Sequence, residues 1–262
     1  MFEGFTERAG ARLYHTAYGR GPTVLMLHDG ALSSLSLNHR MMCTLGDWLW
    51  QRRYQVVTFD LRGFGRSSRV DEFGTDYYQT CADDADAVLA DLGLDDAAVI
   101  GIGDGGVVGL NLAIRHPHRV RALVADSARL KMTSATATGS PPFPTGTAAD
   151  RCRELLDEMH GADYVEPMLS AYSILLRQLA DQRADLYQDR LAEIDCPTLF
   201  LACENDGQGL DNDARALASR VSRSKLVVVH KSGKRVSWSA PARFRAAVGP
   251  FLDEHVTSVV AR

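Results

Sequence analysis

The chain has few cysteines and no excess of positive charge, and both features exclude classes of protein. Its 262 residues include an odd number of cysteines, scattered without the spacing of metal ligands: Cys43, Cys81, Cys152, Cys196 and Cys203. We therefore expect neither a disulfide framework nor a zinc site, and we predict no cofactor. The formal net charge of −4 argues against a nucleic-acid surface.

The sequence also lacks a hydrophobic run long enough to span a membrane. Residues 1–20 do not have the basic and then apolar layout of a signal peptide. We therefore expect a cytoplasmic protein that binds neither membranes nor nucleic acid and whose partner is a small-molecule ligand or substrate; a homo-oligomer is left open. The length and the hydrophobic content of 45% suit one large α/β domain.

Apolar, β-branched runs alternate along the chain with helical patterns. The runs are continuous, as in strands buried on both faces, and cover residues 23–27, 55–59, 97–102, 122–125, 198–202 and 225–229. The helical patterns cover residues 38–52, 80–92, 105–115, 212–222 and 241–255. This order predicts a doubly wound, mostly parallel sheet, with residues 4–18 as an antiparallel ribbon at its edge.

One segment interrupts the alternation. Residues 132–147 are rich in Ser, Thr, Gly and Pro and predict a loop, and helical spacing follows over 150–160 and 163–191. We therefore predict a core formed by residues 1–129 and 192–262, with 130–191 inserted as a helical cap.

A glycine-rich turn follows the third buried run. Residues 101–105 read Gly-Ile-Gly-Asp-Gly between a predicted strand and a predicted helix, which is the setting of the G-x-S-x-G nucleophile elbow. Gly103 stands at the serine position of that pattern and has no side chain that attacks a substrate. The sequence therefore has the frame of a hydrolase without its usual nucleophile.

The motifs and their order resemble the α/β-hydrolase superfamily over nearly the whole chain. Residues 27–30 (Leu-His-Asp-Gly) resemble its oxyanion turn, and 60–68 match its D-x-R-G-x-G-x-S motif. Residues 115–120 after the elbow helix and 196–198 before a late strand also follow the family. The resemblance implies an α/β-hydrolase fold, but function does not transfer with fold.

Matching the family's triad to this chain leaves one member unchanged. The resemblance places Gly103 at the nucleophile, Asp206 at the acid and Lys234 at the base. We expect Asp206 and Lys234 to form an ion pair, which is either structural or an electrostatic clamp. The neighbouring Arg235 is expected at a solvated surface position, and the alternative is that it adds a second positive charge to the site.

An alternative register makes Asp104 the nucleophile, as in aspartate-dependent relatives. An elbow needs small residues two places to either side of its nucleophile. Gly103 has Gly101 and Gly105 at those places, whereas Asp104 has Ile102 and Gly106. This spacing favours Gly103 as the elbow residue.

Several other polar residues fall near the same turn. The backbone N–H of Asp104 is expected to point with that of Gly30 into the oxyanion hole, while its carboxylate is either a helix-end residue or a general acid/base. Asp29 is either a turn residue bound to Gly30 or a carboxylate placed where negative charge normally develops. Asp126 is expected to be a turn residue, although its position is an alternative acid position in some relatives, and His28 is expected to be structural.

The favoured hypothesis is a non-hydrolytic enzyme of the lyase, isomerase, cyclase or dehydratase type, acting on a small, largely apolar carbonyl compound. Its catalytic residues would be Asp104, Lys234 and Asp206. Its substrate would bind against Asp29, Gly30 and Gly103, in a pocket beneath the 130–191 insertion. The alternatives are a non-catalytic, receptor-like pseudohydrolase that binds a small molecule, and a hydrolase with Asp104 as nucleophile.

Overall fold

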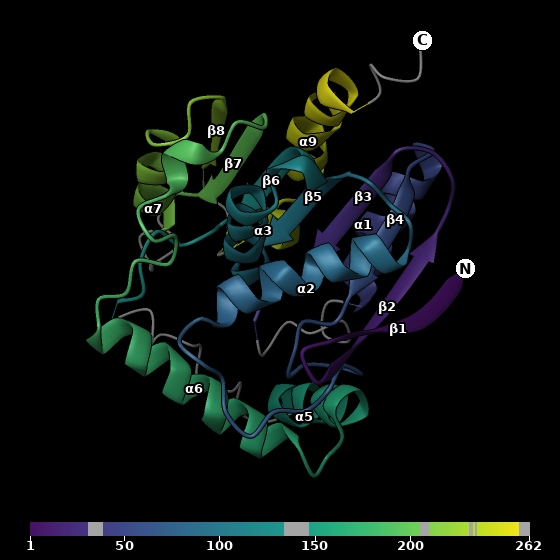
Figure 1. Ribbon diagram of the computed structural model, residues 1–262, viewed down its shortest axis with the longest axis vertical. Helices are drawn as coiled ribbons and strands as arrows, with labels where there is room; N and C mark the ends of the chain where they lie inside the picture. The colour runs from purple at the N-terminus through teal and green to yellow at the C-terminus, as the bar shows by residue number, and fades with distance from the viewer. Residues whose placement is uncertain (31–38, 134–146, 205–209, 231–232, 234, 257–262) are drawn as a thin grey trace.

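The computed structural model describes residues 1–30, 39–133, 147–204, 210–230, 233 and 235–256. An eight-stranded sheet with the order β1-β2-β4-β3-β5-β6-β7-β8 runs through these residues (Figure 1). Its strands are β1 (Phe2–Arg8), β2 (Ala11–Tyr18), β3 (Thr23–Leu27), β4 (Gln55–Phe59), β5 (Ala97–Ile102), β6 (Val120–Asp126), β7 (Thr198–Cys203) and β8 (Ser224–Val229).

The pairing of the strands confirms the predicted mostly parallel sheet. The first two strands form an antiparallel ribbon, β2 pairs antiparallel with β4, and every later pairing is parallel. Three predicted strands have the observed bounds, β7 and β8 are each one residue longer than predicted, and β6 is three residues longer. Within β3, Leu25 and Leu27 belong to one apolar core and Val24 and Met26 to the other, which explains the continuous apolar run.

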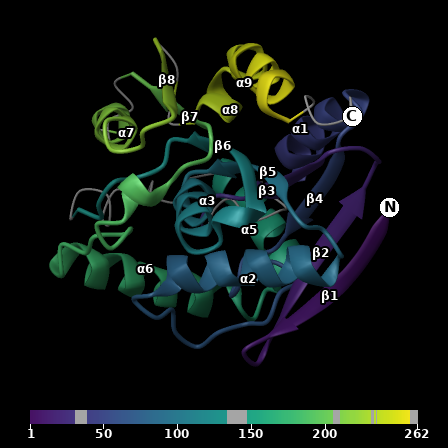
Figure 2. The same cartoon turned by 45° about the horizontal axis from the view of Figure 1, so that its top comes forward.

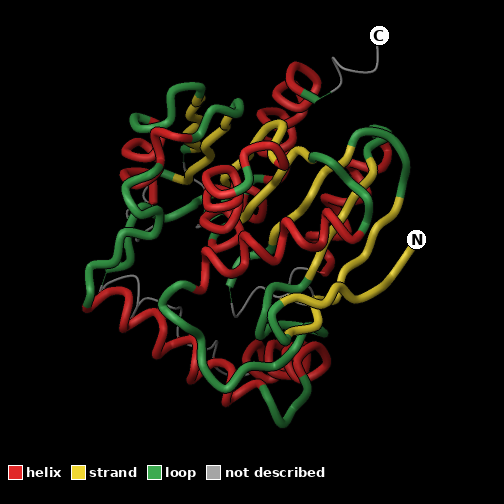
Figure 3. The backbone as a smooth tube through the Cα atoms, viewed as in Figure 1, coloured by secondary structure: helices red, strands yellow, loops and turns green. Residues whose placement is uncertain are grey.

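Helices cover both faces of the sheet (Figure 2). Residues of α2 (Tyr77–Asp91), α3 (Asp104–Arg115) and α7 (Leu210–Ala218) pack into one core. Residues of α1 (His39–Gln51), α8 (Val236–Ser239) and α9 (Pro241–His255) pack into the other. Figure 3 shows the same arrangement of red helices around yellow strands. The doubly wound fold predicted from the sequence is confirmed.

Two helices of the 130–191 segment lie apart from those layers. These are α5 (Thr147–His160) and α6 (Val165–Asp181), which lie next to each other below the sheet in Figure 1. The predicted helical pattern over 163–191 is wrong beyond Asp181, because Arg183 adopts a positive φ of 47° and ends the helix. Leu186 is buried in a turn and Leu191 in a short 3-10 helix (Leu191–Glu193), and these two buried residues extended the apolar spacing beyond the end of α6.

The D-x-R-G-x-G-x-S segment holds these two helices against the core. The N–H of Gly65 donates to Nδ1 of His160 at 2.8 Å, and the N–H of Val70 donates to the hydroxyl of Tyr164 at 2.9 Å. Arg69 pairs with Asp163 at 2.7 Å. These contacts position α6 so that its side chains reach the carboxyl end of the sheet. Most of the predicted 132–147 loop lies outside the described residues, and the separate cap remains a prediction.

Candidate active site

The carboxyl ends of three neighbouring strands bring the polar turns together. The parallel register pairs Leu27 with Gly101 and Ile102 with Asp126. The residues that follow β3, β5 and β6 therefore leave the sheet side by side. In open α/β sheets this is the edge where ligands bind.

Gly103 lies at the apex of the turn between β5 and α3. Its φ of 56° is in the left-handed region, and its N–H donates to the carbonyl of Asp126 at 2.8 Å. A Cβ added to Gly101 would overlap the backbone of Gly105, and one added to Gly105 would overlap the backbone of β3. The strand and the helix therefore crowd this turn, as the sequence predicted, and Asp104 is the first residue of α3.

Two backbone N–H groups converge on the carboxylate of Asp29. Gly30 N donates to Oδ1 at 2.9 Å and Asp104 N donates to the same oxygen at 3.0 Å. The two donors that the sequence places in an oxyanion hole are thus already bonded to an internal anion. A Cβ built on Gly103 would also overlap this carboxylate. The Asp29 side chain therefore occupies both the predicted oxyanion hole and the space that a side chain at position 103 would need.

Arg235 holds the other oxygen of Asp29. Its Nε donates to Oδ2 at 2.8 Å, and the two residues are 6% and 7% exposed. The expected surface position of Arg235 is wrong. Arg235 precedes the short helix α8, and its side chain turns inward because a buried carboxylate needs a cationic partner.

A second ion pair lies beside the first. Oδ1 of Asp104 accepts a hydrogen bond from Nη1 of Arg129 at 2.8 Å, and Oδ2 accepts one from the hydroxyl of Tyr172 on α6. Asp104 is 2% exposed and Arg129 is 8% exposed. A Cβ added to Gly30 would overlap Asp104 and Tyr172. The side chains of both pairs and of α6 therefore pack closely at this edge.

Sequence reasoning missed the contacts that Arg129 and Tyr172 make with Asp104. One signal was available, because Arg129 is a charged residue between Ala128 and Leu130 just after a buried strand. No pattern in the sequence indicates which carboxylate it contacts.

The two carboxylates differ in their acidity although both are buried. Burial raises the pKa of Asp29, but the charge and hydrogen bond of Arg235, with the charge of Arg129, more than offset this and hold it below its usual range. Burial, reinforced by the charge of Asp29, raises the pKa of Asp104 to about 6 against the opposing charge of Arg129. One carboxylate stays ionised while the other exchanges a proton near neutral pH.

Asp126 and His28 hold the backbone of the turns that carry Arg235 and Asp29. The carboxylate of Asp126 accepts the N–H groups of Val236 and Ser237 at 3.1 and 2.8 Å, and so fixes the start of α8 beside Arg235. His28 bonds the carbonyl of Asp29 through Nδ1 and accepts the N–H of Leu61 at Nε2. The expected structural role of His28 is confirmed, and Asp126 has more contacts than a simple turn residue.

The predicted ion pair of Asp206 and Lys234 lies outside the described residues and stays a prediction. The predicted pocket bordered by Gly30, Gly103, Asp104 and Lys234 also stays a prediction, because Lys234 lies outside the described residues. Among the described residues, no group of His, Cys, Asp and Glu is arranged to hold a metal ion. Within the same residues, no helix is long and apolar enough to cross a membrane.

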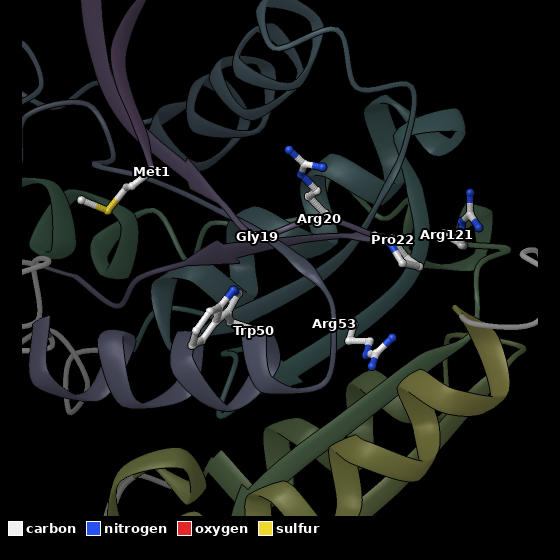
Figure 4. A pocket seen from close by; sticks show the side chains of 8 residues that line it. Met1, Gly19, Arg20, Pro22, Trp50, Arg53 and Arg121 are labelled. Atoms are coloured by element: carbon white, nitrogen blue, oxygen red, sulfur yellow. The ribbon is translucent and has the colours of Figure 1, made fainter.

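A different hollow opens at the opposite end of the sheet. It is lined by Met1, Gly19, Arg20, Gly21, Pro22, Trp50, Arg53 and Arg121, several of which are drawn in Figure 4. Pro22 precedes β3 and Arg121 lies near the start of β6, so the hollow faces the amino ends of these strands. Arg121 is already paired with Asp96 at 2.7 Å. This hollow has no contact with the paired carboxylates described above.

Comparison with known proteins defines the family. Residues 22–159 match the alpha/beta hydrolase fold family, and the chain belongs to that family. The AB hydrolase superfamily protein YisY of Bacillus subtilis (strain 168) is 28% identical over 263 residues, which cover 90% of this chain and 93% of that protein. The uncharacterized hydrolase YraK of the same strain is 33% identical over 121 residues, but this match spans only 42% of YraK and 46% of this chain.

A third relative and two solved structures agree with this family. The putative carbamate hydrolase RutD of Caulobacter sp. (strain K31) is 30% identical over 77% of this chain and 81% of that protein. A hydrolase from Pseudomonas aeruginosa PA01 superposes with a TM-score of 0.75 at 22% identity, covering 95% of this chain and 98% of that one. An esterase from Exiguobacterium antarcticum gives a TM-score of 0.72 at 20% identity, covering 96% and 100%. The structural likeness supports the fold alone.

Proposed function

We propose that this chain is a non-hydrolytic enzyme of the α/β-hydrolase fold, of the lyase, isomerase, cyclase or dehydratase type, acting on a small, largely apolar carbonyl compound. In this proposal Gly103 stands at the nucleophile position and Lys234 at the histidine position, with Asp206 as the remaining acid. The position of the Asp29 carboxylate carries the proposal. Because it occupies both oxyanion-hole donors and the nucleophile's space, attack on an acyl carbon has neither a nucleophile nor a site for the resulting oxyanion.

Proton transfer by Asp104 is the chemistry we propose instead. A general base acts best when its pKa lies near the working pH, and the raised pKa of Asp104 meets that condition. Asp104 would take a proton from the carbon next to the substrate carbonyl. The C–H electron pair would form the carbon–carbon double bond of an enolate, with the charge on its oxygen. The guanidinium groups of Arg129 and Arg235 place two positive charges near that charge.

A small-molecule binding protein is the second candidate. It is favoured by the same filled oxyanion hole, since a binding pocket needs no free donors for a transition state. Two buried carboxylates with opposite pKa shifts favour the enzyme instead, because such pairs are typical of acid/base sites. A hydrolase with Asp104 as nucleophile is less favoured, because Gly103, between the crowded Gly101 and Gly105, is at the apex of the turn and Asp104 is already the first residue of α3.

Solvent deuterium exchange tests the proposal without knowledge of the true substrate. The purified protein is incubated in D₂O with a panel of small ketones, keto acids and 1,3-dicarbonyl compounds, and loss of the α-proton signal is followed by NMR. We expect catalysed exchange for at least one compound. Asp104→Asn should abolish it, whereas the exposed control Asp47→Asn should retain it.

The outcomes separate the three candidates. Exchange at the same rate with Asp104→Asn would contradict the role of Asp104. A compound that binds tightly without exchange would favour the binding protein. Turnover of p-nitrophenyl esters that saturates and depends on Asp104 would favour the aspartate-nucleophile hydrolase.

A further inference from the structure

Arg129 presents one edge of its guanidinium group without a partner. Its Nη1 donates to Asp104, while neither Nε nor Nη2 has a hydrogen-bond partner among the described residues. The side chain is only 10% exposed, and Nε itself is buried. A buried donor without an acceptor is costly, so each such group in a native structure needs an explanation, and a role in catalysis or in binding a ligand is one.

The unpaired edge is the one that other arginines of this protein use to bind carboxylates. In each of these pairs Nε and Nη2 donate side by side to two carboxylate oxygens at 2.7–3.0 Å: Arg62 with Asp84, Arg115 with Asp83, Arg121 with Asp96, and Arg190 with Glu193. This geometry is the usual bidentate recognition of a planar, two-oxygen anion. Arg129 has the same fork at the carboxyl end of the sheet, next to the proposed base.

We propose that Arg129 binds the carboxylate of the substrate through its Nε and Nη2 fork, so that the substrate is a small keto acid rather than a neutral carbonyl compound. This inference rests on the proposed function and names its substrate class. Asp104 is bonded to Nη1 of the same guanidinium. A carboxylate on the fork therefore lies on a neighbouring edge, and the carbon chain attached to it comes within reach of the base.

The surrounding charges favour a singly charged carboxylate over a phosphate. Arg129 and Arg235 are paired with Asp104 and Asp29, so these four groups carry no net charge when both carboxylates are ionised, and the Asp126 carboxyl group also lies near Arg235. A second negative charge on the ligand would be repelled by both carboxylates at short range. An aromatic wall lies beside Asp104, because the ring of Tyr172 contacts Phe64 and Phe73 at centroid distances of 5.6 and 5.5 Å. This wall suits an apolar chain on the acid.

Binding of 2-oxohexanoate tests the proposal. Its affinity for the wild-type protein is compared by isothermal titration calorimetry with that of its neutral methyl ester and of inorganic phosphate. We expect the keto acid to bind at least tenfold more tightly than either. Equal affinity for the ester would overturn the proposal, and equal affinity for phosphate would overturn the carboxylate assignment. This comparison needs no variant and so does not depend on whether a mutant folds.

Substitution of the arginine provides the second test. Arg129→Lys keeps the charge beside Asp104 but removes the fork, and should weaken binding of the keto acid at least tenfold while leaving the ester unchanged. Arg121→Lys is the matched control, because Arg121 uses the same fork on Asp96 at the other end of the sheet. Unchanged keto-acid affinity in folded Arg129→Lys would overturn the inference.

The inference and the proposed function fail in different ways. Asp104→Asn keeps an oxygen for Nη1 of Arg129, so it should retain keto-acid binding while deuterium exchange stops. Keto-acid binding that is weakened in Arg129→Lys, without deuterium exchange in any variant, would contradict the proposed enzymatic function. It would leave the carboxylate site at Arg129 standing. Deuterium exchange that is lost in Asp104→Asn but unchanged in Arg129→Lys would contradict the carboxylate site at Arg129. It would leave the proposed enzymatic function standing.

Discussion

The carboxylate of Asp29 occupies the space into which any side chain at position 103 would project. A Cβ on Gly103 would overlap both carboxylate oxygens and Cγ of Asp29. The two residues lie on different turns, after β3 and β5, and the sheet register brings them together. The glycine at 103 and the aspartate at 29 are therefore sterically coupled.

This coupling predicts a measurable interaction energy. Gly103→Ala should destabilise the protein by about 1–3 kcal/mol through overpacking, in addition to the cost of its positive φ. In an Asp29→Gly background the overpacking should disappear while the φ cost remains. Urea unfolding of the four proteins of this double-mutant cycle gives the coupling directly. Additive effects would contradict the steric relationship.

The same relationship predicts that a serine alone does not restore esterase activity. Gly103→Ser would clash with Asp29 and leave the N–H groups of Gly30 and Asp104 bonded to it, and the proposed base position holds Lys234 instead of a neutral base. We expect hydrolysis of p-nitrophenyl acetate, and labelling by a fluorophosphonate probe, only when Asp29→Gly and Lys234→His are added. If Gly103→Ser alone were labelled as fast as the variant that also carries Asp29→Gly and Lys234→His, the Asp29 carboxylate would not block the site.

The buried ion pair of Asp29 and Arg235 should be far more sensitive to mutation than an exposed one. Asp29→Ala leaves a buried guanidinium without its carboxylate and should cost about 3–5 kcal/mol. Asp253→Ala breaks the pair with Arg52, whose side chains are 32% and 55% exposed, and should cost less than about 1 kcal/mol. Chemical unfolding of both variants provides the comparison, and similar losses would contradict the burial argument.

His160 should make the protein less stable in mild acid. Burial, with the nearby charges of His28 and Arg69, lowers the pKa of His160 to about 4, whereas an unfolded histidine titrates near its ordinary value of 6.5. The unfolded state therefore binds more protons between these values, and the stabilisation present above pH 6.5 is lost as the pH falls towards 4. This loss should reach about 2–3 kcal/mol.

Replacement isolates that contribution. Asn at position 160 still offers an acceptor to the N–H of Gly65, but it does not titrate. The free energy of unfolding of His160→Asn should therefore fall less between pH 7 and pH 4 than that of the wild type. The exposed His118→Asn is the control and should follow the wild type. Parallel curves for wild type and His160→Asn would contradict the prediction.

Two buried histidines should respond in opposite ways to an apolar substitution. Both ring nitrogens of His15 are buried without a hydrogen-bond partner among the described residues, so His15→Leu should be neutral or stabilising by about 1 kcal/mol. His28→Leu would strand the N–H of Leu61 and should cost about 1–3 kcal/mol. Thermal unfolding of both variants tests this contrast, which fails if both lose stability equally.

The strands and the elbow were predictable because their signals are local. A strand buried on both faces needs an unbroken apolar run, and the run over 97–102 predicted β5 with its observed bounds. The turn at Gly103 was predictable because crowding between strand and helix admits only glycine at positions 101 and 105. The end of α6 at Asp181 was not predictable from the sequence, because buried residues after the helix continue its apolar spacing.

The sequence by itself determined the doubly wound sheet, the apex of the elbow, and the direction of the Gly30 and Asp104 N–H groups. Only the tertiary structure decided what those groups bind and which charges are paired. Arg129 lies 25 residues from Asp104, and Arg235 lies 206 residues from Asp29. A long arginine side chain reaches in several directions from one backbone position, so its partner depends on which carboxylates the packed fold has removed from water.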